Sequence, residues 1–315
     1  MKKGILILLL SIFAWYVHGG ILRVATYNVR TEAFSQTNGE DFTSGNQWEK
    51  RRPHVVNILI NQNLDIIGLQ ETTYRQAQQL KSLVNNYSYN FVSECRNGCG
   101  EICNNTCWHD HGPIMYNINK YEVLNRGTFW LSDTPNQKGS QYNNSECPRI
   151  CTWAKFKVKN TNYIFFVFNT HMYLHSGDGI HHIEGVGRQI KSIELINLKI
   201  KEIAGDSPVI VMGDFNSQSV IAYGLKTSPD AYNFMKGVCG FQDCYTVNRD
   251  TTITSTVNDF RRPIYLNNLW GIIDHIFIKG NFTVNSYSII VDSYEDGNIR
   301  RYPSDHFPVV VSLTY

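Results

Sequence analysis

The chain has 315 residues, of which 42% are hydrophobic and 18% are charged, a balance typical of globular proteins. The formal net charge is +2, and removal of Lys2 and Lys3 leaves 27 basic against 27 acidic residues. These values exclude a strong overall attraction to nucleic acid, although a local basic patch would still suit a polyanionic substrate.

A secretory leader is predicted at the amino terminus. The residues MKKGILILLLSIFAWYV join a basic start to an apolar run, and Val17 and Gly19 supply small side chains at a cleavage-like spacing. A membrane anchor is the alternative, but the apolar run is short for a span of roughly 20 residues. We therefore expect a signal peptide over residues 1–19, followed by one secreted, monomeric domain over residues 20–315 with no membrane anchor.

Periodic patterns of apolar residues predict a chain of mixed strands and helices. Strands are indicated by alternating apolar and polar side chains or by short, continuous apolar runs. Helices are indicated by apolar residues three or four positions apart, most clearly in the stripe from Val186 to Ile203. The expected strands cover residues 21–30, 64–70, 113–116, 127–131, 150–158, 163–171, 209–212, 272–278, 287–291 and 307–314. The expected helices cover residues 48–61, 74–84 and 184–203.

The eight cysteines all follow the predicted leader and agree with an oxidising compartment. Those between Cys95 and Cys107 recur every fourth residue instead of forming two close pairs, which favours disulfides over a zinc site. Cys239 and Cys244 are expected to form a local bridge, whereas the spacing leaves the other pairings open. Four N-x-S/T sequences agree with secretion from a glycosylating cell: Asn86, Asn104, Asn143 and Asn281.

The segment from Cys95 to Gly112 is rich in cysteine, glycine and asparagine, so we expect a stapled surface loop. Its stretch WHDH, Trp108 to His111, offers ligands for a metal ion. Histidines in such a loop are more often solvated, and solvated side chains are therefore the favoured interpretation.

Polar side chains stand at the ends of several expected strands. Asn28 lies near the end of the first strand, Glu71 follows the second, and His171 ends the run YIFFVFNTH. The stretch PVIVMGDFNS then supplies Asp214 and Asn216, which lie on the same side of an extended chain because they are two residues apart.

The carboxyl-terminal strands repeat this pattern. The run GIIDHIFI places Asp274 after an apolar pair, and YPSDHFPVVVSL places Asp305 and His306 directly before the final strand. Each residue alone fits a turn or cap as well as a functional site. Because the pattern recurs around the chain, we expect these strand ends to share one site at one edge.

The residue types at these strand ends suit a metal-assisted reaction on a phosphoester. Glu71, Asp305 and the neutral Asn28 offer oxygen ligands of the kind that Mg²⁺ or Ca²⁺ prefers, and no thiolate or histidine set indicates zinc. Magnesium usually takes only one or two protein carboxylates and keeps positions for water and a substrate phosphate.

The remaining strand-end residues supply acid and base groups. Asp214 could hold and deprotonate a water molecule, and Asn216 could place that water or the phosphate. His171 and His306 could donate hydrogen bonds to the non-bridging oxygens, where negative charge develops in the transition state.

Six short motifs follow one another over nearly the whole chain after the leader: TYNVR (Asn28), DIIGLQE (Glu71), NTH (His171), GDFNS (Asp214, Asn216), IDHIF (Asp274) and SDHFPV (Asp305, His306). In this order they resemble the endonuclease/exonuclease/phosphatase superfamily. The resemblance implies an α+β fold, a four-layer α/β/β/α sandwich with two mixed, mainly antiparallel sheets.

The resemblance also implies a division of roles. Glu71 would be the principal ligand of Mg²⁺, or of Mn²⁺ or Ca²⁺, with Asn28 and Asp305 beside it. Asp214 would orient the attacking water, and Asp274 would orient His306. His171 and His306 together would stabilise the phosphoryl group.

Two further stretches, GTFWLSDTP and PRICTWAKF, resemble a secreted branch of this superfamily whose substrates are mostly unassigned. In the second stretch Arg149 precedes an expected strand, where it would either contact the phosphate or be a surface charge. The cysteine-rich insertion departs from the branch, so the branch does not assign the substrate.

The sequence therefore predicts a secreted, divalent-metal-dependent phosphoester hydrolase. A phosphodiester substrate is favoured, with nuclease activity on DNA or RNA slightly ahead of the other activities. Sphingomyelinase-like activity and hydrolysis of inositol phosphates are the alternatives within this reaction class. A secreted binding protein that kept the fold and lost the chemistry is the alternative class, and the complete set of polar residues argues against it.

Overall fold

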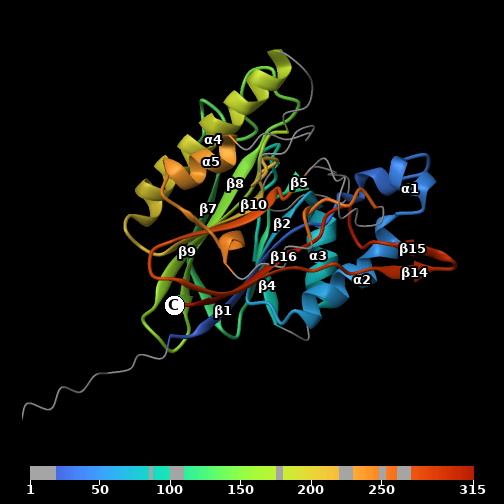
Figure 1. Cartoon of the computed structure of the whole chain (residues 1–315), viewed down its shortest axis with the longest axis horizontal. Coiled ribbons are helices and arrows are strands. Elements are labelled where there is room, and N and C mark those ends of the chain that lie inside the picture. The colour runs from blue at the N-terminus through green and yellow to red at the C-terminus, as the bar shows by residue number, and fades with distance from the viewer. Residues whose placement is uncertain are drawn as a thin grey trace, which may run out of the picture.

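Two sheets form the middle of the molecule in the computed structural model, which describes residues 19–84, 88–99, 110–174, 180–219, 230–247, 253–260 and 271–315. Within these residues each sheet has six strands, in the order β13-β16-β1-β2-β6-β4 for the first sheet and β11-β12-β10-β9-β8-β7 for the second. Helices α2 and α3 cover the outer face of the first sheet, and α4 and α5 cover the outer face of the second (Figure 1). The expected four-layer α/β/β/α sandwich is confirmed.

The strands of the described residues are β1 (Ile21–Asn28), β2 (Ile66–Gln70), β3 (Thr72–Thr73), β4 (Tyr89–Val92), β5 (Asp110–His111), β6 (Ile114–Asn117), β7 (Tyr121–Trp130), β8 (Ile150–Val158), β9 (Ile164–His171), β10 (Val209–Asp214), β11 (Gln242–Asp243), β12 (Asp274–Lys279), β13 (Thr283–Ile289), β14 (Tyr294–Asp296), β15 (Ile299–Arg301) and β16 (Val309–Thr314). The helices are α1 (Glu40–Ser44), α2 (Trp48–Asn61), α3 (Tyr74–Leu83), α4 (Ile180–Ala204) and α5 (Asp230–Gly237).

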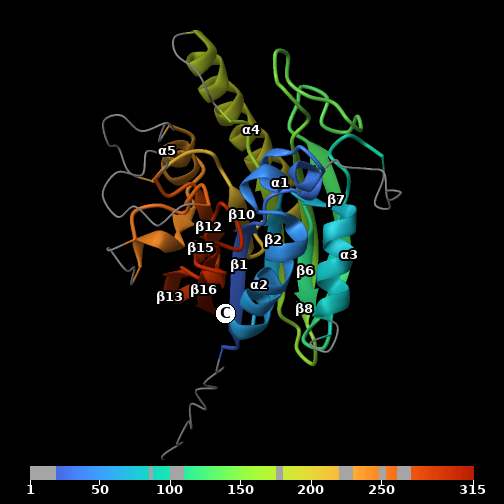
Figure 2. The same ribbon diagram turned by 90° about the vertical axis from the view of Figure 1, so that its right-hand side faces the viewer.

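Apolar side chains fill the three spaces between these four layers. The inner faces of both sheets enclose one cluster, which includes Val24, Phe165 and Ile210. A second cluster lies between the second sheet and α4, where the predicted stripe buries Ile193 and Ile196. A third cluster lies between the first sheet and helices α2 and α3, which face the viewer in Figure 2.

The pairing of strands explains why the polar strand ends meet. In each sheet one central pair is parallel, β1 with β2 and β9 with β10, whereas the other pairs are antiparallel. Parallel neighbours bring their carboxyl ends to the same edge of a sheet. An antiparallel neighbour such as β12 brings its first residue to that edge, which is where Asp274 lies.

The sequence predicts most of the long elements and misses short ones. Helix α2 and strand β8 have the predicted ends, and β7 begins earlier than expected, at Tyr121. Helices α1 and α5 and the hairpin of β14 and β15 were not predicted. The burial pattern of β15 is exposed and half-buried throughout, so it has no apolar periodicity that a sequence pattern could detect.

One disulfide lies within the described residues, between Cys95 and Cys99, and it supports the stapled-loop prediction. The bridge expected between Cys239 and Cys244 is wrong, because both cysteines are free. Cys239 packs between the second sheet and its helices, whereas Cys244 packs between the two sheets, so their thiols lie in different core layers. Cys103 and Cys107 lie outside the described residues.

Of the predicted glycosylation sites, Asn143 and Asn281 are exposed, which leaves both accessible to modification. Asn86, Asn104 and nearly all of the predicted signal peptide lie outside the described residues. No helix within the part of the chain that the structure describes is long and apolar enough to cross a membrane.

Candidate active site

The second sheet places three of the predicted site residues side by side. Strand register pairs Asp214, the last residue of β10, with His171 of β9 on one side and Asp274 of β12 on the other. The His171 Nε2 atom lies 3.5 Å from Asp214 Oδ2. Asp214 is therefore the centre of the row that these strand ends form.

Gly213 permits this close pairing of β9 and β10. Its φ angle is 153°, and a Cβ atom added to it would lie 2.0 Å from the carbonyl oxygen of Thr170 in β9. The expected strand ends at residue 212, before this glycine, but β10 continues through Gly213 to Asp214. The glycine is required because the backbone of the neighbouring strand occupies the space of a side chain.

The first sheet supplies Asn28 and Glu71. Asn28 pairs with Gln70 in the parallel β1 and β2 register, so Glu71 follows one residue beyond it. The Asn28 Nδ2 amide donates to Glu71 Oε1 at 3.1 Å and to Asp214 Oδ2 at 3.1 Å. This fully buried amide therefore connects the two sheets at the site.

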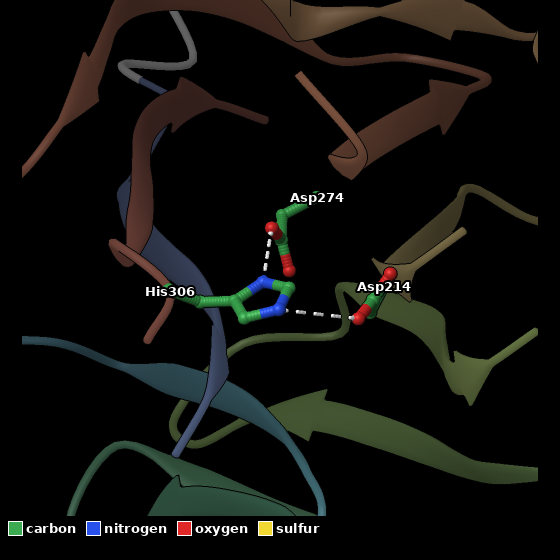
Figure 3. Close-up of side chains that lie close together, drawn as sticks. All are labelled: Asp214, Asp274 and His306. Carbon is green, nitrogen blue, oxygen red and sulfur yellow. Dashed lines mark hydrogen bonds and ion pairs between the residues drawn. The ribbon is translucent and has the colours of Figure 1, made fainter. Parts of the chain in front are cut away.

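Asp305 and His306 reach the same place from the segment that precedes β16. The His306 Nδ1 atom lies 2.9 Å from Asp274 Oδ2, and its Nε2 atom lies 3.8 Å from Asp214 Oδ2 (Figure 3). Asp274 accepts a hydrogen bond from Nδ1–H and thereby holds the ring with Nε2 toward Asp214. The predicted pairing of Asp274 with His306 is thus present in the geometry.

Burial and neighbouring charges shift the acidity of Asp214. Burial first, and then the charge of Asp274, raise the pKa of Asp214 to about 7, although His306 opposes the shift. Hydrogen bonds from the backbone of Asn216 and from the Asn28 amide also oppose it. A carboxylate whose pKa lies near neutrality is suited to take a proton from water.

The two histidines are shifted in opposite directions. Burial, followed by the positive charges of Arg149 and Arg96, lowers the pKa of His171 well below its usual value. Burial also opposes a charge on His306, but Asp274 and Asp214 raise its pKa well above its usual value. His171 is therefore neutral near pH 7 and His306 is protonated, so a single site holds one neutral and one cationic donor.

Glu71 and Asp305 are the carboxylates that fit a metal ion. Burial by itself favours the protonated form of Glu71, but Arg30, the Asn28 amide and His306 hold the pKa of Glu71 below its usual value. Burial and the nearby charge of Glu71 raise the pKa of Asp305. Two carboxylates that repel each other in one cavity offer oxygen ligands that fit a hard divalent cation.

A second cluster of described residues is compact enough to hold a metal ion. One ligand atom each of Asp214, Asp274 and His306 lies within 4.8 Å of the others. A protonated imidazole whose Nδ1 is bonded to Asp274 has no lone pair to offer a metal. This cluster is therefore better suited to proton transfer than to metal binding.

The strand ends line one open cavity of about 220 Å³, which includes Glu71, His171, Asp214, Asn216, Asp305 and His306. Arg149, directly before β8, also lines it. Two interpretations of Arg149 were open, a phosphate contact and a surface charge. Its position in the cavity lining favours the phosphate contact. Asn216 uses its amide Nδ2 to donate to the carbonyl oxygen of Met172 at 3.0 Å, which anchors the loop behind the cavity.

Two features of the site were missed or misjudged from the sequence. Arg30 lines the cavity and its Nη1 atom lies 3.3 Å from Asp305 Oδ2. Arg30 lies two residues after Asn28, and this spacing could have indicated from the sequence that Arg30 lies near the site. His111, expected to be solvated, is buried and hydrogen-bonded to Ser93 Oγ at 2.8 Å, because it pairs with Thr72 in strands β3 and β5.

Comparisons with known proteins agree with this geometry. The model of the endonuclease/exonuclease/phosphatase family matches residues 25–306. A family protein of Bacteroides thetaiotaomicron is 30% identical, with a TM-score of 0.78, over 94% of this chain and 98% of that one. A mannosyl-6-phosphatase of the same bacterium is 31% identical, with a TM-score of 0.76, over 93% of this chain and 100% of that one.

A relative outside the bacteria is an uncharacterized protein of Acanthamoeba polyphaga mimivirus, which is 26% identical over 283 residues, covering 86% of this chain and 93% of the relative. The family match includes every predicted site residue, from Asn28 to His306. The chain therefore belongs to the endonuclease/exonuclease/phosphatase family of phosphoester hydrolases.

Proposed function

We propose that the protein is a secreted, divalent-metal-dependent hydrolase of phosphoesters, with phosphorylated sugars as its first substrate class. The observation that carries the reaction is the row of polar groups around Asp214 Oδ2, where the Asn28 amide, His171 and His306 converge. The pKa of Asp214 is raised, so this carboxylate can act as a base, and the neighbouring His306 is protonated, so it can act as a cationic donor. Phosphoester hydrolysis uses a group of each kind.

In the proposed reaction Asp214 accepts a proton from the water molecule that attacks phosphorus. The bond from phosphorus to the ester oxygen breaks, and that oxygen takes a proton from solvent water, so the alcohol leaves. Asp214 then returns its proton to solvent. Protonated His306 and the neutral ring of His171 donate hydrogen bonds to the phosphoryl oxygens as their charge grows. Asp274 keeps His306 charged and aimed, through the contact of 2.9 Å at Nδ1.

Glu71 and Asp305 would hold the cation, with Asn28 orienting Glu71 through its amide. A divalent cation held there would neutralise charge on the phosphoryl oxygens. Arg30 lies beside both carboxylates and limits their mutual repulsion before any cation binds. Magnesium is the proposed ion, because the ligand atoms are oxygens.

A sugar phosphate is the first substrate to test because the relative with 31% identity over 93% of this chain is named a mannosyl-6-phosphatase. The balanced charge of the chain provides little general attraction for a nucleic acid. A phosphodiester remains the second candidate. A further cavity of about 200 Å³ shares Arg149 and Leu174 with the catalytic cavity, which offers room for a longer substrate.

Secretion is proposed on two grounds. The amino-terminal residues have the pattern of a signal peptide. A disulfide between Cys95 and Cys99 suits an oxidising compartment. Expression in a eukaryotic secretory host, followed by amino-terminal sequencing of the protein in the medium, tests this part separately.

The test of the reaction uses the purified protein with Mg²⁺ and measures phosphate release from mannose 6-phosphate. Cleavage of a generic phosphodiester, DNA and RNA is measured by the appearance of their monoester or fragment products. We expect activity that a chelator abolishes and Mg²⁺ restores. Glu71→Ala and His306→Ala should each lower kcat by at least about 10²-fold, because each removes a group that acts on the phosphoryl centre. Activity that survives both substitutions would refute the proposed site.

A further inference from the structure

A small second cavity adjoins the catalytic cavity on the side of the cysteine-rich segment. Its volume is about 20 Å³, the size of one hydroxyl group or water molecule, and it shares Glu71, Arg149 and His171 with the catalytic cavity. Arg96 and Asp110 complete its outer wall. A substrate whose phosphate lies at His171 can therefore extend its leaving group toward these residues.

The disulfide-stapled turn from Cys95 to Cys99 holds Arg96 in place. The ring that the disulfide closes contains Arg96, whose backbone N–H donates to Asp110 O at 3.0 Å and whose carbonyl accepts from Trp130 Nε1 at 2.6 Å. The Arg96 guanidinium is ion-paired with the Asp110 carboxylate. The turn is thus held by contacts to Asp110 and to Trp130 that do not depend on a ligand.

Strand β5 ties the same residues to the catalytic carboxylate. Asp110 pairs with Thr73 and His111 pairs with Thr72, directly after Glu71. His111 also forms a bridge with Cys95. These pairings connect the turn that carries Arg96 to the residues directly after Glu71.

The walls of this second cavity carry both donors and acceptors. Among the described residues, the Nε atoms of Arg96 and Arg149 have no hydrogen-bond acceptor, and Gln70 Oε1 has no donor. A buried polar group without a partner is destabilising, so a ligand that pairs with these atoms binds more tightly. A phosphate oxygen can only accept, whereas a hydroxyl both donates and accepts.

We propose that this second cavity is a subsite for a hydroxyl group of the substrate's leaving alcohol. The enzyme then selects phosphoesters of polyols, such as sugars or inositols, over those of alcohols without neighbouring hydroxyls. The proposal rests on the proposed function, because it assigns the leaving group of that reaction. Arg96, Asp110 and Gln70 are the residues that would form hydrogen bonds with this hydroxyl.

The test compares kcat/KM for mannose 6-phosphate, myo-inositol 1-phosphate and p-nitrophenyl phosphate in the full-length mature protein. The wild type should prefer at least one of the two polyol esters, and the identity of the better one separates a sugar from an inositol. Arg96→Ala and Asp110→Asn should each lower the ratio of polyol to aryl kcat/KM by about 10–100-fold. Arg96→Lys should restore part of the ratio, since it keeps a donor.

Arg300→Ala is the matched control, because Arg300 lies on the exposed β14 and β15 hairpin and lines none of these cavities. The ratio should not change in this variant. Cys99→Ser should lower the ratio in the same direction as Arg96→Ala, because it opens the ring around Arg96. Two variants that act through different atoms keep the proposal testable if one of them fails to fold.

An unchanged ratio in both Arg96→Ala and Asp110→Asn overturns the subsite, as does a wild type that prefers the aryl ester. If the wild type hydrolyses none of the three esters, the proposed function fails and calorimetry decides the subsite independently. Binding of mannose 6-phosphate should then weaken in Arg96→Ala by about 10-fold relative to binding of p-nitrophenyl phosphate. Equal weakening of both ligands would mean that Arg96 acts on the phosphate instead.

Discussion

At the scale of single residues, the Asp214 carboxylate lies at the centre of the site and is approached by side chains from three other strands or segments. Its Oδ2 atom accepts from the Asn28 amide at 3.1 Å and lies 3.5 Å from His171 and 3.8 Å from His306. Such crowding by donors would lower its pKa in water, yet burial and Asp274 raise it. The site therefore keeps a base of near-neutral pKa beside a protonated imidazole.

The pH dependence of kcat/KM tests the coupling of Asp274 to His306. His306 must be protonated to donate, so activity is present below its pKa and is lost as the pH rises above it. Asp274 is the main partner that raises this pKa. In Asp274→Asn we expect the basic limb of the profile to move to lower pH and kcat to fall by about 10²–10³-fold.

Asp292→Asn is the control for this experiment. Asp292 is exposed, and its side chain accepts a hydrogen bond from the backbone of Ser293. Its pH profile should match that of the wild type. A basic limb that stays in place in Asp274→Asn would show that His306 does not depend on Asp274 for its charge.

At the scale of elements, the parallel pair β9 and β10 sets the distance between His171 and Asp214. The register aligns Gly213 with Thr170 and Asp214 with His171. A side chain at Gly213 would force these strands apart, because its Cβ would lie 2.0 Å from the Thr170 carbonyl oxygen. The glycine in GDFNS is thus a packing requirement of the sheet before it is a feature of the site.

Gly213→Ala should lower the free energy of unfolding by about 2–4 kcal/mol, from overpacking and from a φ angle that alanine rarely adopts. Urea denaturation measures this change, and phosphate release should fall with it. Gly237→Ala in α5 is the matched control, because a Cβ there meets no atom within 4 Å. It should be neutral or stabilise by up to about 1 kcal/mol. Equal effects of the two substitutions would contradict the assigned role of Gly213.

At the scale of the whole molecule, Arg51 connects helix α2 to the segments that carry the site. Its guanidinium is fully buried and donates to the carbonyl oxygens of Asn46 at 2.7 Å, Val29 at 2.8 Å, Pro303 at 2.8 Å and Arg30 at 3.1 Å. Val29 and Arg30 directly follow β1, and Pro303 precedes the SDH motif. One cation thus holds together three parts of the chain that are distant in sequence.

Arg51→Lys should lower the free energy of unfolding by about 3 kcal/mol or more, because a single ammonium cannot reach four carbonyl groups spread around a planar guanidinium. Thermal unfolding monitored by circular dichroism measures the loss. The same substitution at the exposed Arg300 should change stability by less than about 0.5 kcal/mol. An Arg51→Lys protein as stable as the wild type would refute the proposed connection.

Much of the fold and of the candidate site follows from the sequence, for a local reason. The long elements can be predicted because their apolar residues recur with a regular period, as in the stripe of α4 that buries Ile193 and Ile196. The polar residues that end these runs, such as Asp214 and Asp274, stand out because they interrupt an apolar pattern. Short elements such as β14 and β15 lack this contrast and were missed.

The sequence by itself determined the reaction class, the order of most of the long strands and helices, and the residue types offered at the strand ends. Only the tertiary structure decided which of those ends meet, because strand register brings Asp214 beside His171 and Asp274. It also decided what stands next to them: Arg30 beside Asp305, and Arg96 beside Arg149. These contacts join segments far apart in the chain, and local patterns carry no information on distances of that kind.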